Sequence, residues 1–302
     1  MFHTCLFLLF LSNTVLSLQI CSFNVRSFGE AKRTQPDVLD IIVKVISRCD
    51  IILLMEIKDS SNRICPFLLE KLNSQIQDEY SYVVSNRLGR KTYKEQYAFF
   101  YRSKMVTVRR TYQYPDLQPG DEDALSREPF VVWFYSPKTV VREFVIIPLH
   151  TTPETSVREI DELYDVYLDV KQLWKSESFI FMGDFNAGCN YVAKKHWKNI
   201  RLRNHTEFIW LIDDKNDTTV RASTHCPYDR EFVIIPLHTT PETSVREIDE
   251  LYDVYLDVKQ LWKSESFIFM GDFNAGCNYV AKKHWKNIRL RNHTEFIWLI
   301  DY

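Results

Sequence analysis

An internal repeat without a single substitution is the feature that most constrains this chain. Residues 142–213 recur as residues 230–301. Repeats that stack into solenoids have periods of roughly 20 to 50 residues, and their copies normally diverge. This block is longer, and both of its ends fall inside what should be one domain, which favours a recent duplication over a tandem design. We therefore predict a leader at 1–17, an incomplete domain at 18–230 and a duplicate of 142–213 at 231–302.

The composition favours a folded protein with a sizeable core. The chain has 302 residues, of which 45% are hydrophobic and 14% aromatic, and this content argues against disorder. The formal net charge is only −2. Such a balance gives no general attraction to a polyanion, so binding of nucleic acid must come from local basic residues or metal ions.

The N-terminal segment is typical of a secretory signal peptide. Residues 2–18 are strongly apolar but too short to span a bilayer, and the small Ser17 marks a cleavage position. We therefore predict a secreted protein that passes through the lumen of the endoplasmic reticulum, with no membrane span after cleavage. Export permits disulfides among the six cysteines that follow the leader. Three glycosylation sequons, which are consistent with export, begin at Asn204, Asn216 and Asn292.

Outside the repeat, short apolar runs alternate with amphipathic stretches. Residues 19–25 alternate as a strand does, and residues 51–57 form the near-continuous apolar run of a buried strand. The pattern favours two sheets packed together with helices outside them. A helix between these two strands is expected to bury Val38, Ile41, Ile42, Val45 and Ile46. Further strands are expected at 99–101, 106–114, 131–135, 144–149 and 179–182, and a second helix at 157–174.

One buried strand ends in Gly183-Asp184-Phe185-Asn186, which is typical of a metal or phosphate site. A carboxylate and an amide at a strand end offer the oxygen ligands that Mg²⁺ prefers, although Gly, Asp and Asn also form plain turns. Gathering several polar groups in one place without a ligand would be costly, so the wider pattern favours a shared site. The other polar groups near strand ends are Asn24, Glu56, His150 and Asp229.

Seven ordered segments resemble the deoxyribonuclease I family, and within it the gamma branch. The matching segments are CSFNVRSFG at 21–29, MEIKD at 55–59, YKEQYAF at 93–99, SREPF at 126–130, PLHTTPET at 148–155, GDFNAGC at 183–189 and CPYDR at 226–230. So many ordered matches exclude coincidence. The resemblance implies a four-layer α/β sandwich that hydrolyses phosphodiester bonds of double-stranded DNA with Mg²⁺ and Ca²⁺.

The resemblance also implies roles for individual residues. Glu95 and His150 form an acid/base pair, and Asp229 belongs to the pair of a second histidine. Contacts to phosphate do not read sequence, so low sequence specificity follows. The residues around the metal and the scissile phosphate are Asn24, Glu56, Asp184 and Asn186. The residues that contact the DNA backbone are Lys58, Tyr93 and Arg127.

Structural features of the family carry over in the same way. Cys189 and Cys226 match its disulfide. Asp121 and Asp123 lie in an acidic loop that resembles a structural Ca²⁺ site, with a solvated turn as the alternative. We expect a monomer. The family resemblance leaves entry into the nucleus open. Because two identical segments compete for one set of neighbours, domain swapping is also open.

After Arg230 the sequence departs from the family. The family continues into its last strands and a Ser-Asp-His segment, which supplies a second catalytic histidine and a metal-binding aspartate. This chain restarts the repeat instead, and the tripeptide does not occur in it. We expect residues 232–237 to occupy the strand position after Arg230. Residues 269–270 are expected to occupy another, with Asp272 near the place of the missing aspartate.

The copied motif lacks partners of its own. His238, Asp272 and Asn274 repeat the first motif without a second Glu95, so we predict that they are non-catalytic. Cys277 is expected to be a free thiol or a competitor for Cys226.

The sequence is compatible with three functions. The first is a secreted, metal-dependent endodeoxyribonuclease. A related enzyme that acts on lipid or inositol phosphates is disfavoured, because the runs at 95–99 and 126–130 belong to the nuclease branch. An inactive protein that binds DNA or a protein partner is the third, and the missing second histidine favours it.

Overall fold

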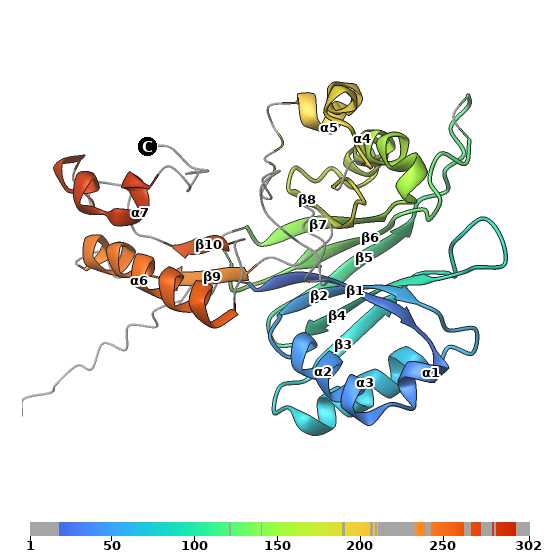
Figure 1. Cartoon of the computed structure of the whole chain (residues 1–302), viewed down its shortest axis with the longest axis horizontal. Helices are drawn as coiled ribbons and strands as arrows, with labels where there is room; N and C mark the ends of the chain where they lie inside the picture. The colour runs from blue at the N-terminus through green and yellow to red at the C-terminus, as the bar shows by residue number, and fades with distance from the viewer. Residues whose placement is uncertain are drawn as a thin grey trace, which may run out of the picture.

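Two four-stranded sheets face each other, and helices cover the outer face of each sheet (Figure 1). Three buried apolar clusters fill the spaces between the resulting four layers. The predicted four-layer α/β sandwich is confirmed. The computed structural model describes residues 18–120, 122–139, 141–188, 191–205, 208, 210, 233–238, 243–262, 267–272, 280 and 282–293.

The first sheet has the strand order β1-β2-β4-β3. β1 runs parallel to β2, and the other neighbours are antiparallel. Its outer face packs against the second and third of the three helices that lie between its strands in sequence. The strands are β1 (Ile20–Phe28), β2 (Ile51–Ile57), β3 (Tyr80–Val84) and β4 (Gln96–Arg102). The helices on this side are α1 (Glu30–Arg33), α2 (Pro36–Ile46) and α3 (Ile64–Gln75).

The second sheet has the strand order β5-β6-β7-β8, with β7 and β8 parallel. Its outer face packs against α4 and α5. No helix in the described part of the chain is long and apolar enough to cross a bilayer. The strands are β5 (Thr107–Gln113), β6 (Phe130–Tyr135), β7 (Glu143–His150) and β8 (Phe179–Asp184). The helical elements are η1 (Pro153–Thr155), α4 (Ser156–Trp174), η2 (Lys194–Asn199) and α5 (Arg201–Asn204).

Strand β2 shows why a continuous apolar run was needed. Successive side chains of a strand point to opposite faces. Ile52 and Leu54 pack under the helices of the first sheet, whereas Leu53 and Met55 pack between the two sheets. Both faces of β2 are therefore buried, and the predicted buried strand at 51–57 is confirmed.

The face of helix α2 was predicted incorrectly at one position. Ile41 is 60% exposed, while Leu39 and Val43 are buried with Ile42 and Ile46. The stretch contains more apolar residues than one helix face can bury, so the periodicity alone allowed two neighbouring stripes. Packing against β2 and α3 selected the stripe that includes Leu39.

The duplicated block forms a unit of its own. β9 and β10 pair in parallel as a two-stranded sheet, so the expectation that residues 232–237 join the sandwich is wrong. The duplicated block contains a copy of β8, which is β10, and β9 pairs with β10 as β7 pairs with β8. Figure 1 shows this unit beside the sandwich. Its elements are β9 (Val233–His238), α6 (Ser244–Trp262), β10 (Phe267–Asp272), η3 (Lys282–Asn287) and α7 (Arg289–Asn292).

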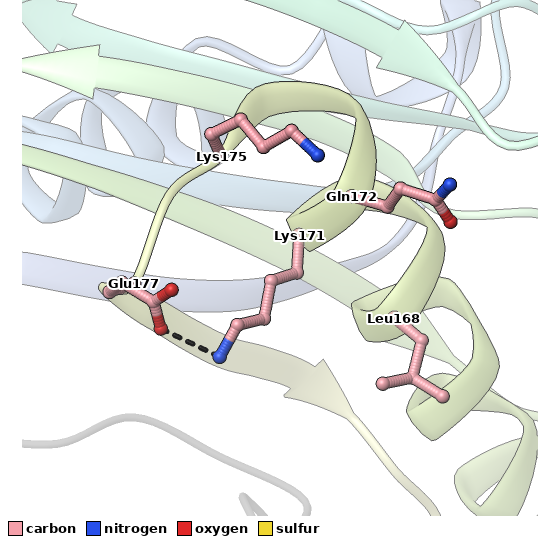
Figure 2. A pocket seen from close by; sticks show the side chains of 5 residues that line it. All are labelled: Leu168, Lys171, Gln172, Lys175 and Glu177. Carbon is pink, nitrogen blue, oxygen red and sulfur yellow. Dashed lines mark ion pairs between the residues drawn. The ribbon is translucent and has the colours of Figure 1, made fainter.

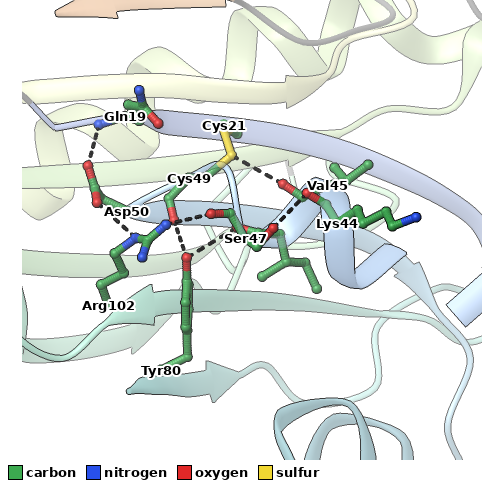
Figure 3. The surroundings of a disulfide bond; sticks show 10 residues. Gln19, Cys21, Lys44, Val45, Ser47, Cys49, Asp50, Tyr80 and Arg102 are labelled. Atoms are coloured by element: carbon green, nitrogen blue, oxygen red, sulfur yellow. Dashed lines mark hydrogen bonds and ion pairs between the residues drawn. A yellow bond between two sulfur atoms is a disulfide. The ribbon is translucent and has the colours of Figure 1, made fainter. Parts of the chain in front are cut away.

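A disulfide joins Cys21 in β1 to Cys49 after α2 (Figure 3). The sequence did not indicate this pairing. Near it, Asp50 accepts a hydrogen bond from the Gln19 N–H at 2.8 Å and forms an ion pair with Arg102 at 3.1 Å. The predicted Cys189–Cys226 bond lies outside the described residues.

We expect the double variant Cys21→Ser/Cys49→Ser to lower the free energy of unfolding by about 3–4 kcal/mol. The bond closes a loop of 28 residues, and the chain-entropy relation gives that magnitude. Urea denaturation with and without dithiothreitol measures the effect. Reductant should destabilise the wild type by more than it destabilises the double variant, in which the expected Cys189–Cys226 bond remains; a wild type that is insensitive to reductant would contradict the prediction.

The buried Asp59 fixes the start of helix α3. Its Oδ2 accepts a hydrogen bond from the Ile64 N–H at 2.6 Å, and its Oδ1 accepts bonds from the N–H and the hydroxyl of Ser61 at 2.9 and 2.8 Å. Burial raises the pKa of Asp59, but these donated bonds outweigh burial, and the net pKa lies below its usual value. The ionised carboxylate is therefore the form that stabilises the fold.

We expect Asp59→Asn to lower the free energy of unfolding at pH 7 by about 1–3 kcal/mol. Because the folded-state pKa is depressed, the stabilisation is present above the unfolded pKa of about 3.9 and is lost as pH falls through the folded pKa. Urea titrations should thus give a smaller gap between wild type and variant at pH 3 than at pH 7. The exposed Asp37→Asn is the control, and a constant gap at both pH values would refute the assignment.

Candidate active site

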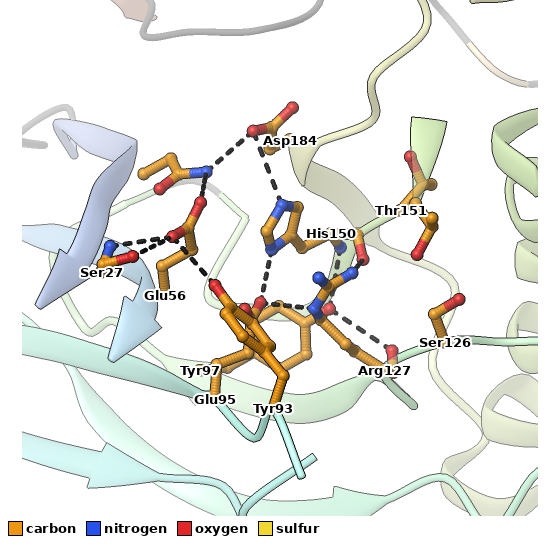
Figure 4. Close-up of polar contacts among 12 residues, drawn as sticks. Ser27, Glu56, Tyr93, Glu95, Tyr97, Ser126, Arg127, His150, Thr151 and Asp184 are labelled. Carbon is orange, nitrogen blue, oxygen red and sulfur yellow. Dashed lines mark hydrogen bonds and ion pairs between the residues drawn. The ribbon is translucent and has the colours of Figure 1, made fainter. Parts of the chain in front are cut away.

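The site lies where strands from both sheets end. In a parallel pair, the carboxyl ends of both strands meet at one edge, and His150 of β7 is the register partner of Asp184 of β8. On the facing sheet, Asn24 of β1 lies beside Met55 of β2, next to Glu56. Figure 4 shows the side chains of Glu56, His150 and Asp184 turned toward one another.

Irregular backbone at the strand ends places these groups. The pairing of β1 with β2 shifts between Asn24 and Phe28, and that of β2 with β4 shifts between Leu54 and Ile57. Glu56 lies in the second irregularity with φ +58°, and Asn186 has φ +44°. Left-handed backbone at non-glycine residues is costly and is commonly kept where a side chain must be aimed.

His150 is held on four sides. Its Nδ1 lies 2.5 Å from Glu95 Oε1, and its backbone N–H donates to the Tyr97 hydroxyl at 2.8 Å. Its carbonyl oxygen accepts a hydrogen bond from Arg127 Nη1 at 3.1 Å. The remaining ring nitrogen, Nε2, lies 3.8 Å from Asp184 Oδ2. The imidazole therefore has one fixed orientation, with Nε2 as the nitrogen that faces the carboxylates.

Glu95 is a buried side chain with two nitrogen partners on one oxygen. The side chain is 3% exposed, and Oε1 lies 2.6 Å from Arg127 Nε as well as 2.5 Å from His150 Nδ1. Arg127 thus places a fixed positive charge directly against the Glu95 side chain. Because Glu95 occupies the Nδ1 side of the ring, Nε2 is the nitrogen left to exchange a proton. Tyr97 packs beside this pair, and its complete burial raises the pKa of its hydroxyl well above the usual value.

One amide holds the two carboxylates together. Asn24 Nδ2 donates to Glu56 Oε1 at 3.0 Å and to Asp184 Oδ2 at 2.9 Å. Glu56 Oε2 also accepts the Ser27 N–H at 2.8 Å and the Tyr93 hydroxyl at 3.4 Å. Burial raises the pKa of Asp184 despite the nearby His150 and Asn24. Burial acts in the same sense on Glu56, but its hydrogen bonds and His150 outweigh it and leave its pKa lowered.

The donor set fits a hard divalent cation. Glu56 and Asp184 present carboxylate oxygens, and Mg²⁺ and Ca²⁺ prefer oxygen ligands. Asn186 uses its Nδ2 to donate to the Thr151 carbonyl at 3.1 Å, and its backbone N–H donates to Asp184 Oδ1 at 3.3 Å. Within the described ranges, no three His, Cys, Asp or Glu side chains are arranged as a ready metal cluster. A bound ion here would need water or phosphate oxygens as further ligands.

The residues predicted to contact DNA lie in two different settings. Tyr93 is 46% exposed at the rim of the site, and the Lys58 ammonium lies 3.8 Å from the centre of its ring. Arg127 instead turns inward, with Nε on Glu95 and Nη1 on the His150 carbonyl. In the structure, Arg127 therefore holds Glu95 and the backbone of His150 in place.

The other predicted residues are only partly described. Asp229 and Asp121 lie outside the described residues. Asp123 Oδ2 forms an ion pair with Arg90 Nε at 3.2 Å.

Glu159 of α4 is a site residue that the sequence analysis missed. It is fully buried and accepts hydrogen bonds from the Ser126 N–H at 3.0 Å, the Ser126 hydroxyl at 2.9 Å and the Thr152 N–H at 3.0 Å. One carboxylate thus joins the segment that carries Arg127 to the segment that follows His150. A glutamate on the apolar face of the helix, one position before the buried Ile160, was the available signal.

A surface hollow on the outer side of α4 is not part of this site. It is lined by Leu168, Lys171, Gln172, Lys175 and Glu177 (Figure 2). Lys171 Nζ and Glu177 Oε2 form an ion pair at 2.6 Å across it. Both partners are substantially exposed, so this hollow lacks the desolvated acid/base groups that the strand ends provide.

The fold and the site together define a class, and comparison with known proteins agrees with it. A model of the endonuclease/exonuclease/phosphatase family matches residues 21–230 and 210–302. Deoxyribonuclease gamma of Homo sapiens is 67% identical over 228 residues, which cover 74% of this chain and 75% of the relative. Deoxyribonuclease-1 of Rattus norvegicus is 51% identical over 215 residues, with 71% and 75% covered. The chain therefore belongs to the deoxyribonucleases of the endonuclease/exonuclease/phosphatase family, which confirms the predicted resemblance.

Among solved structures, the similarity is weaker. A crystal structure of an endonuclease/exonuclease/phosphatase family protein from Bacteroides thetaiotaomicron aligns with a TM-score of 0.46 and 15% identity. The alignment covers 72% of this chain and 82% of that one.

Proposed function

We propose that this protein is a divalent-metal-dependent endonuclease that hydrolyses phosphodiester bonds of double-stranded DNA with low sequence specificity. The observation that carries the proposal is the buried Glu95–His150 pair, whose free Nε2 faces Asp184 beside Glu56. The 67% identity to a deoxyribonuclease supports DNA as the substrate.

His150 is the general acid/base in this proposal. Glu95 keeps the proton on Nδ1, so Nε2 takes a proton from the attacking water or returns one to the leaving oxygen. Glu95 also stabilises the imidazolium that forms during the transfer. Arg127 and Tyr97 hold the backbone on either side of the ring, and the nitrogen therefore needs no reorientation during the step.

Glu56 and Asp184 would hold Mg²⁺ or Ca²⁺, with Asn24 and Asn186 beside them. The bound ion would supply positive charge to the scissile phosphate. Asn24 keeps the two carboxylates at one place by donating to both. The left-handed backbone at Glu56 aims its carboxylate toward that place.

The rim of the site supplies the contacts to the DNA backbone. Lys58 and Tyr93 form a paired, exposed surface there, and Arg127 lies beneath it. Phosphate contacts of this kind position a duplex without reading its bases. Asp229, by family correspondence, would belong to a second acid/base pair, and Asp121 and Asp123 to a structural calcium loop.

An exported protein is part of the same proposal. The Cys21–Cys49 disulfide supports an oxidising compartment, in agreement with the signal peptide expected at 1–17. In such a compartment the three sequons would be glycosylated, and Cys189 would form its disulfide with Cys226. The protein would act as a monomer, with domain swapping through the duplicated block as the route to larger species.

Nicking of supercoiled plasmid DNA tests the function. We expect open-circular product in the presence of Mg²⁺ and Ca²⁺, and complete loss of product when excess EDTA removes both ions, because the paired carboxylates then lack their cation. Readdition of Mg²⁺ should restore cleavage. DNA binding by gel shift without any metal-dependent nicking would instead support the inactive, DNA-binding alternative.

A further inference from the structure

The two copies of the repeat form the same unit. β7 pairs with β8 through six register partners from Val145↔Phe179 to His150↔Asp184, and β9 pairs with β10 through the six corresponding partners. The connecting helices α4 and α6 have the same length of 19 residues. Each copy therefore has the same strand–helix–strand geometry.

The polar contacts inside the units also correspond. Arg201 in the first unit contacts Asp161 through its backbone N–H at 2.7 Å and its Nε at 3.1 Å. Arg289 in the second unit contacts Asp249 at 2.8 and 3.1 Å through the same atoms. Each unit thus closes its helix onto its C-terminal turn without help from the sandwich.

The first unit differs from the second in its contacts to the rest of the sandwich. β7 pairs with β6 through Val132↔Ile146 and three neighbouring pairs, and Glu159 accepts two hydrogen bonds from Ser126. His150 binds Glu95. The second unit repeats every residue on its side of these contacts. Among the described residues, the edge of β9 that corresponds to the β6 edge of β7 carries no strand.

We propose that the second unit exchanges with the first at strand β6 and that His238 then takes the place of His150 opposite Glu95. The sequence predicts His238 to be non-catalytic because it lacks a glutamate partner of its own. In the exchanged arrangement Glu95 supplies that partner, so His238 becomes a second catalytic histidine and Asp272 replaces Asp184. The inference rests on the proposed function of the His150 site. Since the docking residues are identical, both arrangements form the same contacts with the sandwich.

The length of the connection sets the population of the exchanged arrangement. Residues 136–142 link β6 to β7, whereas residues 136–232 would link β6 to β9, a connection about 14 times as long. If the whole connection were flexible, loop closure would disfavour it by roughly the three-halves power of that ratio, or about 50-fold. The displaced first unit keeps its own fold and shortens the flexible part, so at least about 2% of the molecules should hold His238 at the site.

Histidine variants separate the two arrangements by activity. We expect His150→Ala to retain at least about 2% of wild-type nicking. His150→Ala/His238→Ala should lose this remainder. His150→Ala/His284→Ala is the matched control, because His284 lies in the same copy within η3 and should leave the remainder intact. Equal rates of His150→Ala and His150→Ala/His238→Ala would overturn the exchange. Wild-type rates in His150→Ala/His238→Ala would instead overturn the proposed function.

A cross-link tests the exchange without using activity. Tyr135 and Glu143 are register partners at the end of the β6–β7 pair, and partners in an antiparallel pair lie within disulfide range. Tyr135→Cys/Glu143→Cys should cross-link almost completely. In Tyr135→Cys/Glu231→Cys, a disulfide should form within one chain. This bond should accumulate slowly as the oxidant traps the minor arrangement. Peptide mapping that finds no 135–231 bond after prolonged oxidation would exclude the exchange, whatever the rates show.

Discussion

Glu95→Gln lowers kcat for DNA nicking by about 10²–10⁴-fold, the usual contribution of a positioned acid/base group. A glutamine in this position carries no charge and cannot stabilise the imidazolium of His150. The loss should be larger than that of His150→Ala, since Glu95 serves either histidine. Initial rates on supercoiled plasmid measure the effect, and the exposed Glu154→Gln, which follows the same strand end, should retain wild-type activity.

Folding must be separated from chemistry in this variant. Arg127 is only 15% exposed, and losing one partner of a buried ion pair costs about 3–5 kcal/mol. Glu95→Gln/Arg127→Met removes both charges and should recover most of that stability in urea titrations. Its kcat should remain at the level of Glu95→Gln or below. If Glu95→Gln folds and cleaves DNA at the wild-type rate, His150 does not act through Glu95.

Local sequence patterns were sufficient to predict most of the sheets. The continuous apolar run at 51–57 is β2, and the apolar run at 144–149 lies inside β7. Polar groups at strand ends identified Glu56, His150 and Asp184. Parallel pairing explains why His150 of β7 and Asp184 of β8 meet at one edge of the second sheet. Glu56 belongs to β2 of the first sheet and reaches them because the two sheets face each other.

Contacts between distant segments could not be predicted in this way. Glu95 and His150 are 55 positions apart, and only the family resemblance linked them before the structure placed Nδ1 on Oε1. Tyr97 reaches the His150 N–H from a different sheet. Glu159 depends on the rotation of α4 about its axis, which is fixed by packing rather than by spacing. The Cys21–Cys49 pair likewise follows from where α2 ends relative to β1.

Asp184→Asn should lower kcat by at least about 100-fold, since the several kcal/mol that a metal-bound charge contributes to phosphoryl chemistry depend on this carboxylate. The Mg²⁺ concentration for half-maximal activity should rise in parallel. The amide keeps the size of the side chain, so the geometry around Asn24 and His150 is preserved to first order. The loss of kcat should therefore come from weaker binding of the cation and from the changed electrostatics at His150 Nε2.

In contrast to kcat, the free energy of unfolding of Asp184→Asn should not fall. Burial raises the pKa of Asp184, which means that the folded protein disfavours its charged form, and the neutral amide removes that penalty. Urea titration without metal should therefore find Asp184→Asn at least as stable as the wild type. A residue whose removal lowers activity while sparing or increasing stability is retained for chemistry and not for the fold. Loss of stability together with unchanged kcat would place Asp184 in the scaffold, and the cation would then have to be held by Glu56 with other ligands.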